Sequence, residues 1–206
     1  QMCIRDRVRT EHMFFGPERL IEMRRFILAS NHDERVQALE KIKTYQVEDF
    51  ETIFRLSQDR PTIVRLLDPP LHEFLPSSEE DINNVSQQLN VSSEFLRKRI
   101  VDLNEVNPML GHRGCRLAVT YPELYEMQVE AIIESVIKLQ KEGITCLPEI
   151  MIPLVSTVEE FTTLKERLVN TITYLEKESQ QDIQYMIGTM IETPRACLIA
   201  NDLAKH

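Results

Sequence analysis

The chain has 206 residues, of which 42% are hydrophobic and 28% are charged, a composition typical of a soluble domain with a packed core. Its 33 acidic and 24 basic residues leave a net charge of −9, which argues against nucleic acid as a partner because the phosphate backbone would be repelled. No apolar run approaches the roughly 20 residues that span a bilayer, so we expect no membrane segment.

The first part of the chain has helical periodicity. Apolar residues recur at helical spacing over residues 18–56 and predict three helices, with Asp33 as the N-cap of the second. The period then changes. Thr62–Leu67 is a β-branched run followed at once by Asp68, Pro69 and Pro70, which predicts a buried strand that ends in a rigid loop.

The middle of the chain is predicted to hold two more helices and a weaker strand. A capping-box pattern at Ser77–Glu80 begins a helix over residues 79–89, and a second helix covers residues 93–104. Asn107, Pro108 and Gly111 then interrupt the chain. After this break, the short apolar run Cys115–Val119 predicts a strand.

A long amphipathic helix is predicted over residues 122–141, and Gly143 suits the position just after its end. Residues 149–155 are a second clear buried strand, and Ser156 is a suitable cap for the helix that follows.

Residues 185–191 predict the last strand. Thr193 and Pro194 then fit the N-cap and first position of a helix that continues to His206. Because strands and helices alternate, we expect parallel β/α units with both faces of the sheet covered. A complete (β/α)8 barrel typically needs about 250 residues, so the pattern leaves either an open α/β sheet or an incomplete barrel.

Polar residues gather where the predicted strands end. Arg65 lies in the first clear strand and Asp68 just past it, Arg113 lies in a Gly-rich turn, and Glu192 comes at the end of the last strand. Active sites of barrels are built at such ends, guanidinium groups match carboxylate and phosphoryl oxygens, and a lone carboxylate beside substrate oxygens is typical of Mg²⁺. The pattern favours an anionic substrate with a divalent metal, and structural salt bridges are the alternative.

The four cysteines, Cys3, Cys115, Cys146 and Cys197, contain no C-x-x-C pair, so reduced thiols are favoured over a zinc site or a disulfide framework.

Five blocks resemble, in the same order, the sequence of the pyruvate, phosphate dikinases, from about Val8 onward. The blocks are Arg9–Phe15 (RTEHMFF), Arg65–Pro76 (RLLDPPLHEFLP), Asn107–Leu117 (NPMLGHRGCRL), Glu149–Val155 (EIMIPLV) and Gly188–Ala196 (GTMIETPRA). Phosphoenolpyruvate (PEP) synthase and enzyme I of the sugar phosphotransferase system share only the cores of such blocks. The assignment to the dikinases therefore depends mainly on Asp68–Pro76.

The resemblance implies an enzyme, a phosphotransferase that interconverts ATP, phosphate and pyruvate with AMP, diphosphate and PEP through a phosphohistidine. It implies that Arg9, Arg65 and Arg113 hold the phosphoryl and carboxylate groups of pyruvate or PEP. Glu192 matches a residue that binds substrate and the cofactor Mg²⁺. The implied partners are the phosphohistidine and ATP-grasp domains of the parent chain and a second copy in a homodimer. The implied location is cytoplasmic, with a plastid or another organelle open for the parent protein.

By the same resemblance, residues 1–7 are a foreign or disordered leader and residues 8–206 are part of the PEP/pyruvate-binding domain. We expect an α/β fold, an incomplete (β/α)8 TIM-type barrel with extra helices, truncated at both ends and without its first strand and last two strands. No catalytic residue is then retained, since the proton-donor Cys lies further on, and the chain alone is inactive. We also expect Glu11 and Asp68 to orient the neighbouring arginines. A PEP synthase or enzyme I relative and a non-catalytic α/β scaffold are the alternatives.

Overall fold

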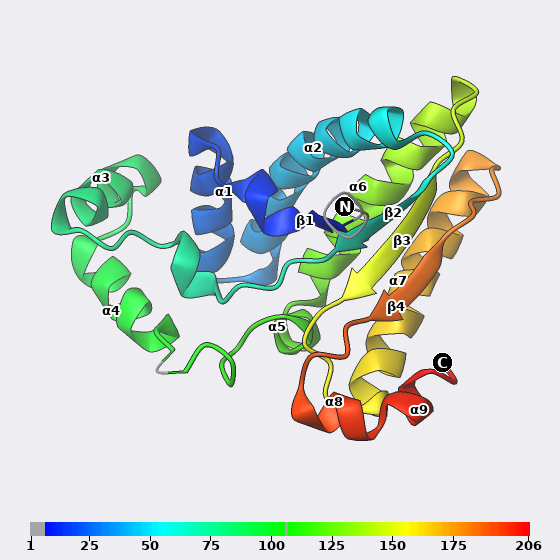
Figure 1. The fold of residues 1–206 in the computed structure, drawn as a ribbon. Coiled ribbons are helices and arrows are strands. Elements are labelled where there is room, and N and C mark those ends of the chain that lie inside the picture. Colours follow the sequence, from blue (N-terminus) through cyan, green and yellow to red (C-terminus); the bar gives the residue numbers. More distant parts are fainter. Residues whose placement is uncertain (1–6, 106) are drawn as a thin grey trace.

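The computed structural model describes residues 7–105 and 107–206, which form a mixed α/β fold around one parallel sheet (Figure 1). The strands follow one another across the sheet in sequence order, and each pairs in parallel with the next. They are β1 (Arg7–Arg9), β2 (Pro61–Arg65), β3 (Leu147–Ile152) and β4 (Met186–Thr189). The predicted parallel α/β architecture is therefore confirmed.

Helices occupy most of the remaining described residues. They are α1 (Pro17–Leu28), α2 (His32–Ser57), α3 (Glu79–Leu89), α4 (Ser93–Leu103), α5 (Cys115–Thr120), α6 (Pro122–Lys141), α7 (Val158–Ser179), α8 (Pro194–Leu198) and α9 (Ala200–Leu203), with 3₁₀ segments at Thr10–Phe14 and Leu71–Phe74. Figure 1 shows α3 and α4 set apart from the sheet, beyond α1. Within the described ranges, none of the helices combines the length and apolarity that crossing a membrane requires.

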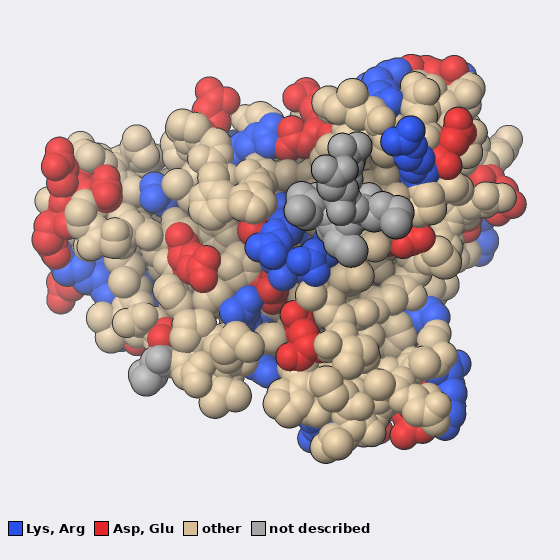
Figure 2. Space-filling model, in the orientation of Figure 1, with Lys and Arg blue, Asp and Glu red and all other residues tan. Residues whose placement is uncertain are grey.

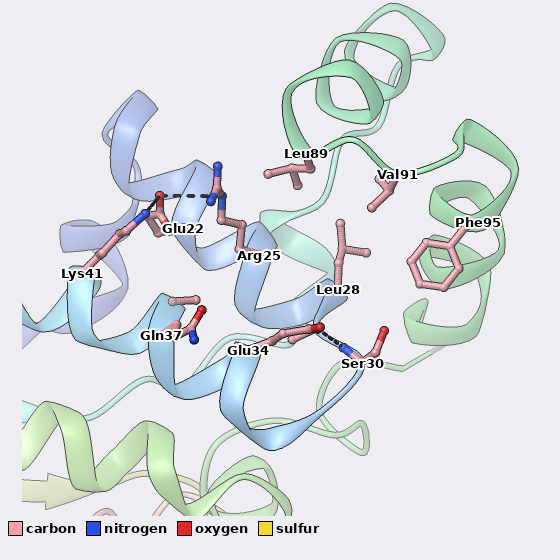
Figure 3. A pocket seen from close by; sticks show the side chains of 12 residues that line it. Glu22, Arg25, Leu28, Ser30, Glu34, Gln37, Lys41, Leu89, Val91 and Phe95 are labelled. Carbon is pink, nitrogen blue, oxygen red and sulfur yellow. Dashed lines mark hydrogen bonds and ion pairs between the residues drawn. The ribbon is translucent and has the colours of Figure 1, made fainter.

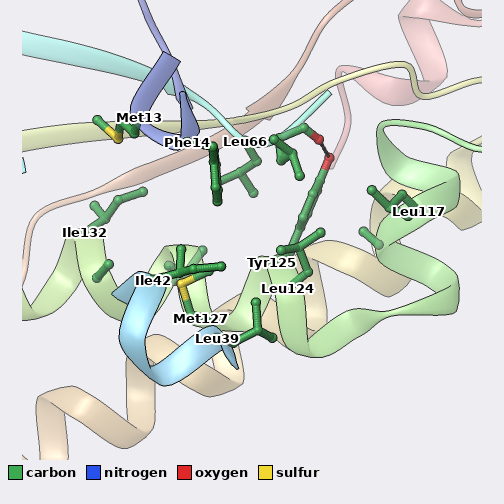
Figure 4. Packing of buried hydrophobic residues seen from close by; sticks show 14 of the residues in the cluster. Met13, Phe14, Leu39, Ile42, Leu66, Leu117, Leu124, Tyr125, Met127 and Ile132 are labelled. Atoms are coloured by element: carbon green, nitrogen blue, oxygen red, sulfur yellow. Dashed lines mark hydrogen bonds between the residues drawn. The ribbon is translucent and has the colours of Figure 1, made fainter. Parts of the chain in front are cut away.

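Helix α6 forms the centre of the core. It occupies the predicted residues 122–141, and the members of its predicted apolar face, such as Leu124 and Ile132, are fully buried. Figure 4 shows these side chains packed below Phe14 and Leu66, which come from the segments after β1 and β2. Helix α6 therefore supports the segments that leave the sheet at its carboxyl edge.

Two helices begin at a neighbour of the predicted cap. The side chain of Asn31, rather than Asp33, caps α2, and Thr157, rather than Ser156, caps α7 in a reciprocal capping box with Glu160. In both places two residues one or two positions apart have suitable side chains. The choice depends on which one has extended backbone, and the sequence does not show this.

The predicted strand Cys115–Val119 is wrong, because these residues form helix α5. Gly114 precedes them with a φ of +56°, and the backbone N–H of Cys115 donates to the carbonyl oxygen of Pro153 at 3.1 Å instead of joining the sheet. A short apolar run fits a buried helix turn as well as a strand, and the tertiary contacts of Gly114 decide for the helix.

The two ends of the chain also differ from the prediction. The single helix expected up to His206 is two short helices, α8 and α9, separated at Ile199. At the other end, β1 is a strand that runs into the Arg9 block and ends at Arg9, where we expected the first strand to be missing. Arg7, assigned to the leader, belongs to this strand, and residues 1–6 of the predicted leader lie outside the described residues.

Candidate functional site

The carboxyl ends of the parallel strands lie at one edge of the sheet, and the predicted site residues are found there. Arg9 ends β1 and pairs in register with Arg65, which ends β2. Glu192 lies just beyond β4, and Arg113 lies in the loop before α5. Figure 2 shows basic side chains gathered near the middle of the corresponding face, with acidic side chains beside them.

Arg65 is the most buried of the predicted residues, with 7% of its surface exposed. Its guanidinium forms an ion pair with Glu11 and donates from one terminal nitrogen to Asp68 Oδ2 at 2.9 Å. The hydroxyl of Thr10 donates to the carbonyl oxygen of Arg65 at 3.0 Å, which ties the 3₁₀ segment to the end of β2. A buried charge is tolerated only when it is paired and hydrogen-bonded, so Glu11 and Asp68 hold this arginine in place.

Asp68 joins two arginines through a single oxygen. Its Oδ2 accepts from Arg65 at 2.9 Å and from a terminal nitrogen of Arg113 at 2.8 Å. Arg113 Nε also donates to the backbone carbonyl of Asp68 at 3.2 Å. The expectation that Glu11 and Asp68 orient the neighbouring arginines is thus confirmed. The two guanidinium groups are held side by side before any ligand arrives.

The arginines differ in how far solvent reaches them. Arg65 has five N–H donors, and its Nε is buried without a partner among the described residues. The Arg113 side chain is 17% exposed, compared with 9% for Arg65, and Arg9 is an exposed residue. An anion from solvent can therefore contact Arg9 and Arg113 more readily, while Arg65 contributes positive charge from its buried position.

Glu192 is connected to this cluster through the backbone. Its Oε1 accepts from the N–H of Leu154 at 2.8 Å, and Leu154 has a φ of +65°, which is unusual for a branched residue. Gly114 packs closely against Leu154 and Asp68, because a Cβ built on it would lie 2.8 Å from Leu154 Cβ and 3.1 Å from Asp68 Oδ1. The backbone N–H of Gly114 donates to the carbonyl of Asp68 at 3.1 Å. Glu192 is therefore linked to Asp68, the partner of both arginines, through the close packing of Leu154 and Gly114.

Arg9 is the predicted residue that the structure does not bring into this network. Its backbone lies beside Arg65 through the pairing of β1 with β2. Its side chain makes no hydrogen bond or ion pair with the residues that the structure describes. The structure thus joins Arg65 with Arg113, ties Glu192 nearby and leaves the Arg9 side chain outside the hydrogen-bonded cluster.

A metal ion at this site would have to share its ligands between the protein and water or a bound molecule. Residues 7–105 and 107–206 contain no group of three or more His, Cys, Asp or Glu side chains that could surround a metal ion. Glu192 uses Oε1 for Leu154, and its other oxygen makes no hydrogen bond within the same ranges. Because Mg²⁺ takes many of its ligands from water and substrate, one or two protein carboxylates are sufficient.

Two buried titratable groups lie under the site. Burial, with a smaller contribution from Glu160, raises the pKa of the Cys115 thiol to about 12, and its Sγ donates to the carbonyl of Leu154 at 3.2 Å. Burial likewise raises the pKa of Tyr125 well above its ordinary value, and its hydroxyl donates to the carbonyl of Leu67 at 2.7 Å. Both groups stay protonated near neutral pH, so they serve as structural supports rather than as nucleophiles.

Sequence reasoning did not identify the contribution of Gly114 and Leu154. Gly114, next to Arg113, was a usable signal, because a glycine beside a functional residue often marks a close backbone approach. Nothing in the sequence indicated the left-handed backbone of Leu154, which depends on its contacts with Gly114 and Glu192.

Comparison with known proteins covers nearly the whole chain. The model of the PEP-utilising enzyme family, PEP-binding domain, matches residues 7–206. The chain is 45% identical over 199 residues to the pyruvate, phosphate dikinase of Rickettsia felis, which is 96% of this chain and 23% of that protein. It is 43% identical over 199 residues to the dikinase of Clostridium symbiosum, with the same shares covered. The chloroplastic pyruvate, phosphate dikinase 1 of Arabidopsis thaliana is 45% identical over 200 residues, which are 96% of this chain and 21% of that protein. The chain thus spans less than a quarter of the length of these curated relatives.

Proposed function

The chain belongs to the PEP-utilising enzymes, whose PEP-binding domain it matches, and from this premise we propose that it binds PEP or pyruvate at the carboxyl edge of its sheet as part of a pyruvate, phosphate dikinase. The parent enzyme would interconvert ATP, phosphate and pyruvate with AMP, diphosphate and PEP. Its phosphohistidine and ATP-grasp domains, and a second copy in a homodimer, would be the partners. We propose a cytoplasmic location, or a plastid or another organelle for the parent protein.

The observation that carries the proposal is the pair of arginines held on one oxygen of Asp68. PEP carries a carboxylate and a phosphoryl group on three carbons, so its binding requires more than one cation in a fixed geometry. Arg65 and Arg113 are fixed at 2.9 and 2.8 Å from Asp68 Oδ2, and the backbone of Arg9 lies beside Arg65. Guanidinium groups arranged before the ligand binds do not have to be ordered at the moment of reaction.

The residues have distinct proposed roles. Arg9 and Arg113, which solvent reaches, would contact the oxygens of the ligand, and Arg65 would offset the charge of the moving phosphoryl group from its buried position. Glu192 would hold Mg²⁺ through the oxygen that Leu154 does not use. When bound there, the ion supplies positive charge that favours the enolate form of pyruvate.

We also propose that the sheet is part of an incomplete (β/α)8 barrel. Parallel strands that follow one another in sequence order, with long helices between them, support this reading. So does the position of the arginines and Glu192 at the carboxyl ends of strands, where barrels carry their active sites.

Binding of PEP to the 206-residue chain tests the proposal. We expect isothermal titration to detect PEP binding that strengthens with Mg²⁺, and Arg113→Met to weaken it about tenfold or more because a charge-assisted contact is lost. Arg97→Gln is the matched control, since Arg97 is an exposed arginine that pairs with Glu79. If Arg113→Met binds PEP as tightly as the unmodified chain, or Glu192→Gln retains the full Mg²⁺ effect, the assignment of the site is wrong.

A further inference from the structure

A second concave site lies away from the strand ends, between α1, the first turns of α2 and the connection from α3 to α4 (Figure 3). It has a volume of about 420 Å³, which lies within the range typical of small-molecule pockets. None of the predicted site residues lines it. It is therefore separate from the proposed PEP site.

One wall of this pocket is apolar. Leu28 comes from the end of α1, Leu89 and Val91 flank the turn after α3, and Phe95 comes from α4. Figure 3 shows these four side chains together on one side of the pocket. Phe95 is 43% exposed, which is high for a phenylalanine, so this wall keeps apolar surface available to a ligand.

The opposite wall carries two cations around one carboxylate. Glu22 Oε1 lies 3.3 Å from Lys41 Nζ and 3.8 Å from Arg25 Nε, and the side chains of Arg25 and Lys41 are 48% and 58% exposed. Glu34 also lines the pocket, but its two oxygens accept from the backbone N–H of Ser30 at 2.8 Å and from the side chain of Asn31 at 3.0 Å.

The free hydrogen-bonding capacity of this wall consists mainly of donors. Arg25 has five N–H groups, and none makes a hydrogen bond within the described part of the chain. Lys41 uses one donor, on Glu22. Among the acceptors, each oxygen of Glu34 already takes one hydrogen bond and Glu22 Oε2 is buried, which leaves the neutral side chains of Ser30 and Gln37. The charged groups of this wall with free hydrogen-bonding capacity are donors, so a ligand that pairs with them must bring acceptors.

We propose that this pocket binds a small amphipathic anion, whose carboxylate or phosphate group contacts Arg25 and Lys41 and whose apolar body lies against Leu28, Leu89, Val91 and Phe95. Guanidinium and ammonium groups bind such anions through charge-assisted hydrogen bonds. The apolar wall contributes by removing ligand surface from water. The proposal is independent of the PEP site, because the two sites share no residue.

Octanoate and octylamine are suitable probes, because they have the same number of carbons and opposite charge. In titrations of the chain followed by amide NMR, we expect octanoate to bind with a Kd of about 1 mM or tighter, and octylamine at least fivefold more weakly. The shifted amides should belong to α1, α2 and the turn between α3 and α4. Inorganic phosphate, which lacks the apolar body, should bind more weakly than octanoate.

Substitutions test the contributions of the charged wall and the apolar wall separately. Arg25→Gln with Lys41→Gln should weaken octanoate at least fivefold, and Phe95→Ala should weaken it without affecting phosphate. Lys177→Gln, at an exposed lysine on α7, is the matched control and should change nothing. Arg25→Glu should reverse the preference in favour of octylamine. All these side chains are substantially exposed, so the variants are expected to fold, and an unchanged urea midpoint would verify this. Equal binding of the two probes, or octanoate binding that survives the double substitution, would overturn the proposal.

Discussion

The strand-end cluster and the helical pocket both place two cations around one carboxylate, yet they differ in burial. At the strand ends, Asp68 holds Arg65 and Arg113 at 2.9 and 2.8 Å, and the two arginine side chains are 9% and 17% exposed. In the pocket, Glu22 lies 3.3 and 3.8 Å from Lys41 and Arg25, whose side chains are about half exposed.

Because of this difference, the charges at the strand ends are fixed by their partners, whereas the cations of the pocket are free to contact a ligand. Where the ions are buried, every partner is needed, because an unpaired charge in the interior is strongly unfavourable. Where the cations are half exposed, water replaces a lost partner and the net contribution of the pair is small. The strand ends are therefore suited to a ligand that needs a fixed geometry, and the pocket to one that relies on general charge and apolar contact.

The largest expected effect comes from Asp68→Asn. This change keeps the shape of the side chain but leaves Arg113 without its ion pair and Arg65 with Glu11 alone. We expect the free energy of unfolding to fall by about 3–5 kcal/mol, as when one partner of a buried ion pair is removed. Urea denaturation measures this. Asp202→Asn, at an exposed pair with Lys205, is the control and should leave the midpoint unchanged. A similar midpoint for both variants would mean that the buried strand-end cluster contributes no more to stability than an exposed ion pair.

The next effect tests the packing that connects Glu192 to the arginines. Gly114→Ala forces a Cβ to within 2.8 Å of Leu154 Cβ at a φ of +56°, whereas Gly143→Ala at φ +81° meets nothing within 4 Å. Both variants carry backbone strain, but only Gly114→Ala adds overpacking, so it should be less stable by a further 1–3 kcal/mol, approximately. Thermal unfolding compares the two. Equal losses of stability would mean that Leu154 moves aside freely.

The pH dependence of stability tests how well the groups buried beneath the strand ends are shielded from solvent. The folded chain keeps the Cys115 proton up to a pKa of about 12, whereas the unfolded chain loses it near the ordinary value of 9.0. Unfolding therefore releases a proton between these values, and stability falls as pH rises through this window, by up to about 1.4 kcal/mol per pH unit. Tyr125 and Cys146, whose pKa values are also raised by burial, act in the same direction.

The contribution of Cys115 is isolated by comparing the unmodified chain with Cys115→Ala. The difference between their urea midpoints should narrow from pH 8 to pH 10.5, because the variant lacks this proton release. A constant difference across that range would mean that the thiol is not shielded as its burial implies.

The smallest effect is expected in the helical pocket. Glu22→Gln is the counterpart of Asp68→Asn, because the Glu22 side chain is only 11% exposed, but its partners Arg25 and Lys41 are half exposed and can be solvated. We expect a loss of about 1 kcal/mol or less in urea denaturation, together with tighter octanoate binding because one negative charge is removed. A loss as large as that of Asp68→Asn would show that exposure does not distinguish the clusters.

Much of the fold could be predicted because its longer elements have clear periods, although the second and third of the three helices predicted over residues 18–56 are one continuous helix, α2. Helix α6 occupies the predicted residues, and β2, β3 and β4 lie within the predicted apolar runs or differ from them at their ends. The predictions of short elements were wrong for a physical reason. The run Cys115–Val119 is compatible with two structures, and Arg7–Arg9 has too few apolar residues to indicate a strand.

The sequence indicated which residues belong to the candidate site, but not how their side chains contact one another. The motifs placed Arg65, Arg113 and Glu192 near strand ends, and the proximity of Asp68 to Arg65 indicated their pairing. The contact from Asp68 to Arg113 spans 45 residues, so local spacing could not predict it. The burial of Arg65 and the separate position of the Arg9 side chain likewise depend on how β1 and β2 pack.

The site at the strand ends is built from segments that lie far apart in the sequence. Contacts that build it join residues 54, 45 and 38 positions apart, in the pairs Arg65–Glu11, Arg113–Asp68 and Leu154–Glu192. Each contact closes a long loop, so the site exists only after distant β/α units have come together. Any ligand of this edge binds the assembled chain alone, and it therefore stabilises every unit at once, including those it never touches.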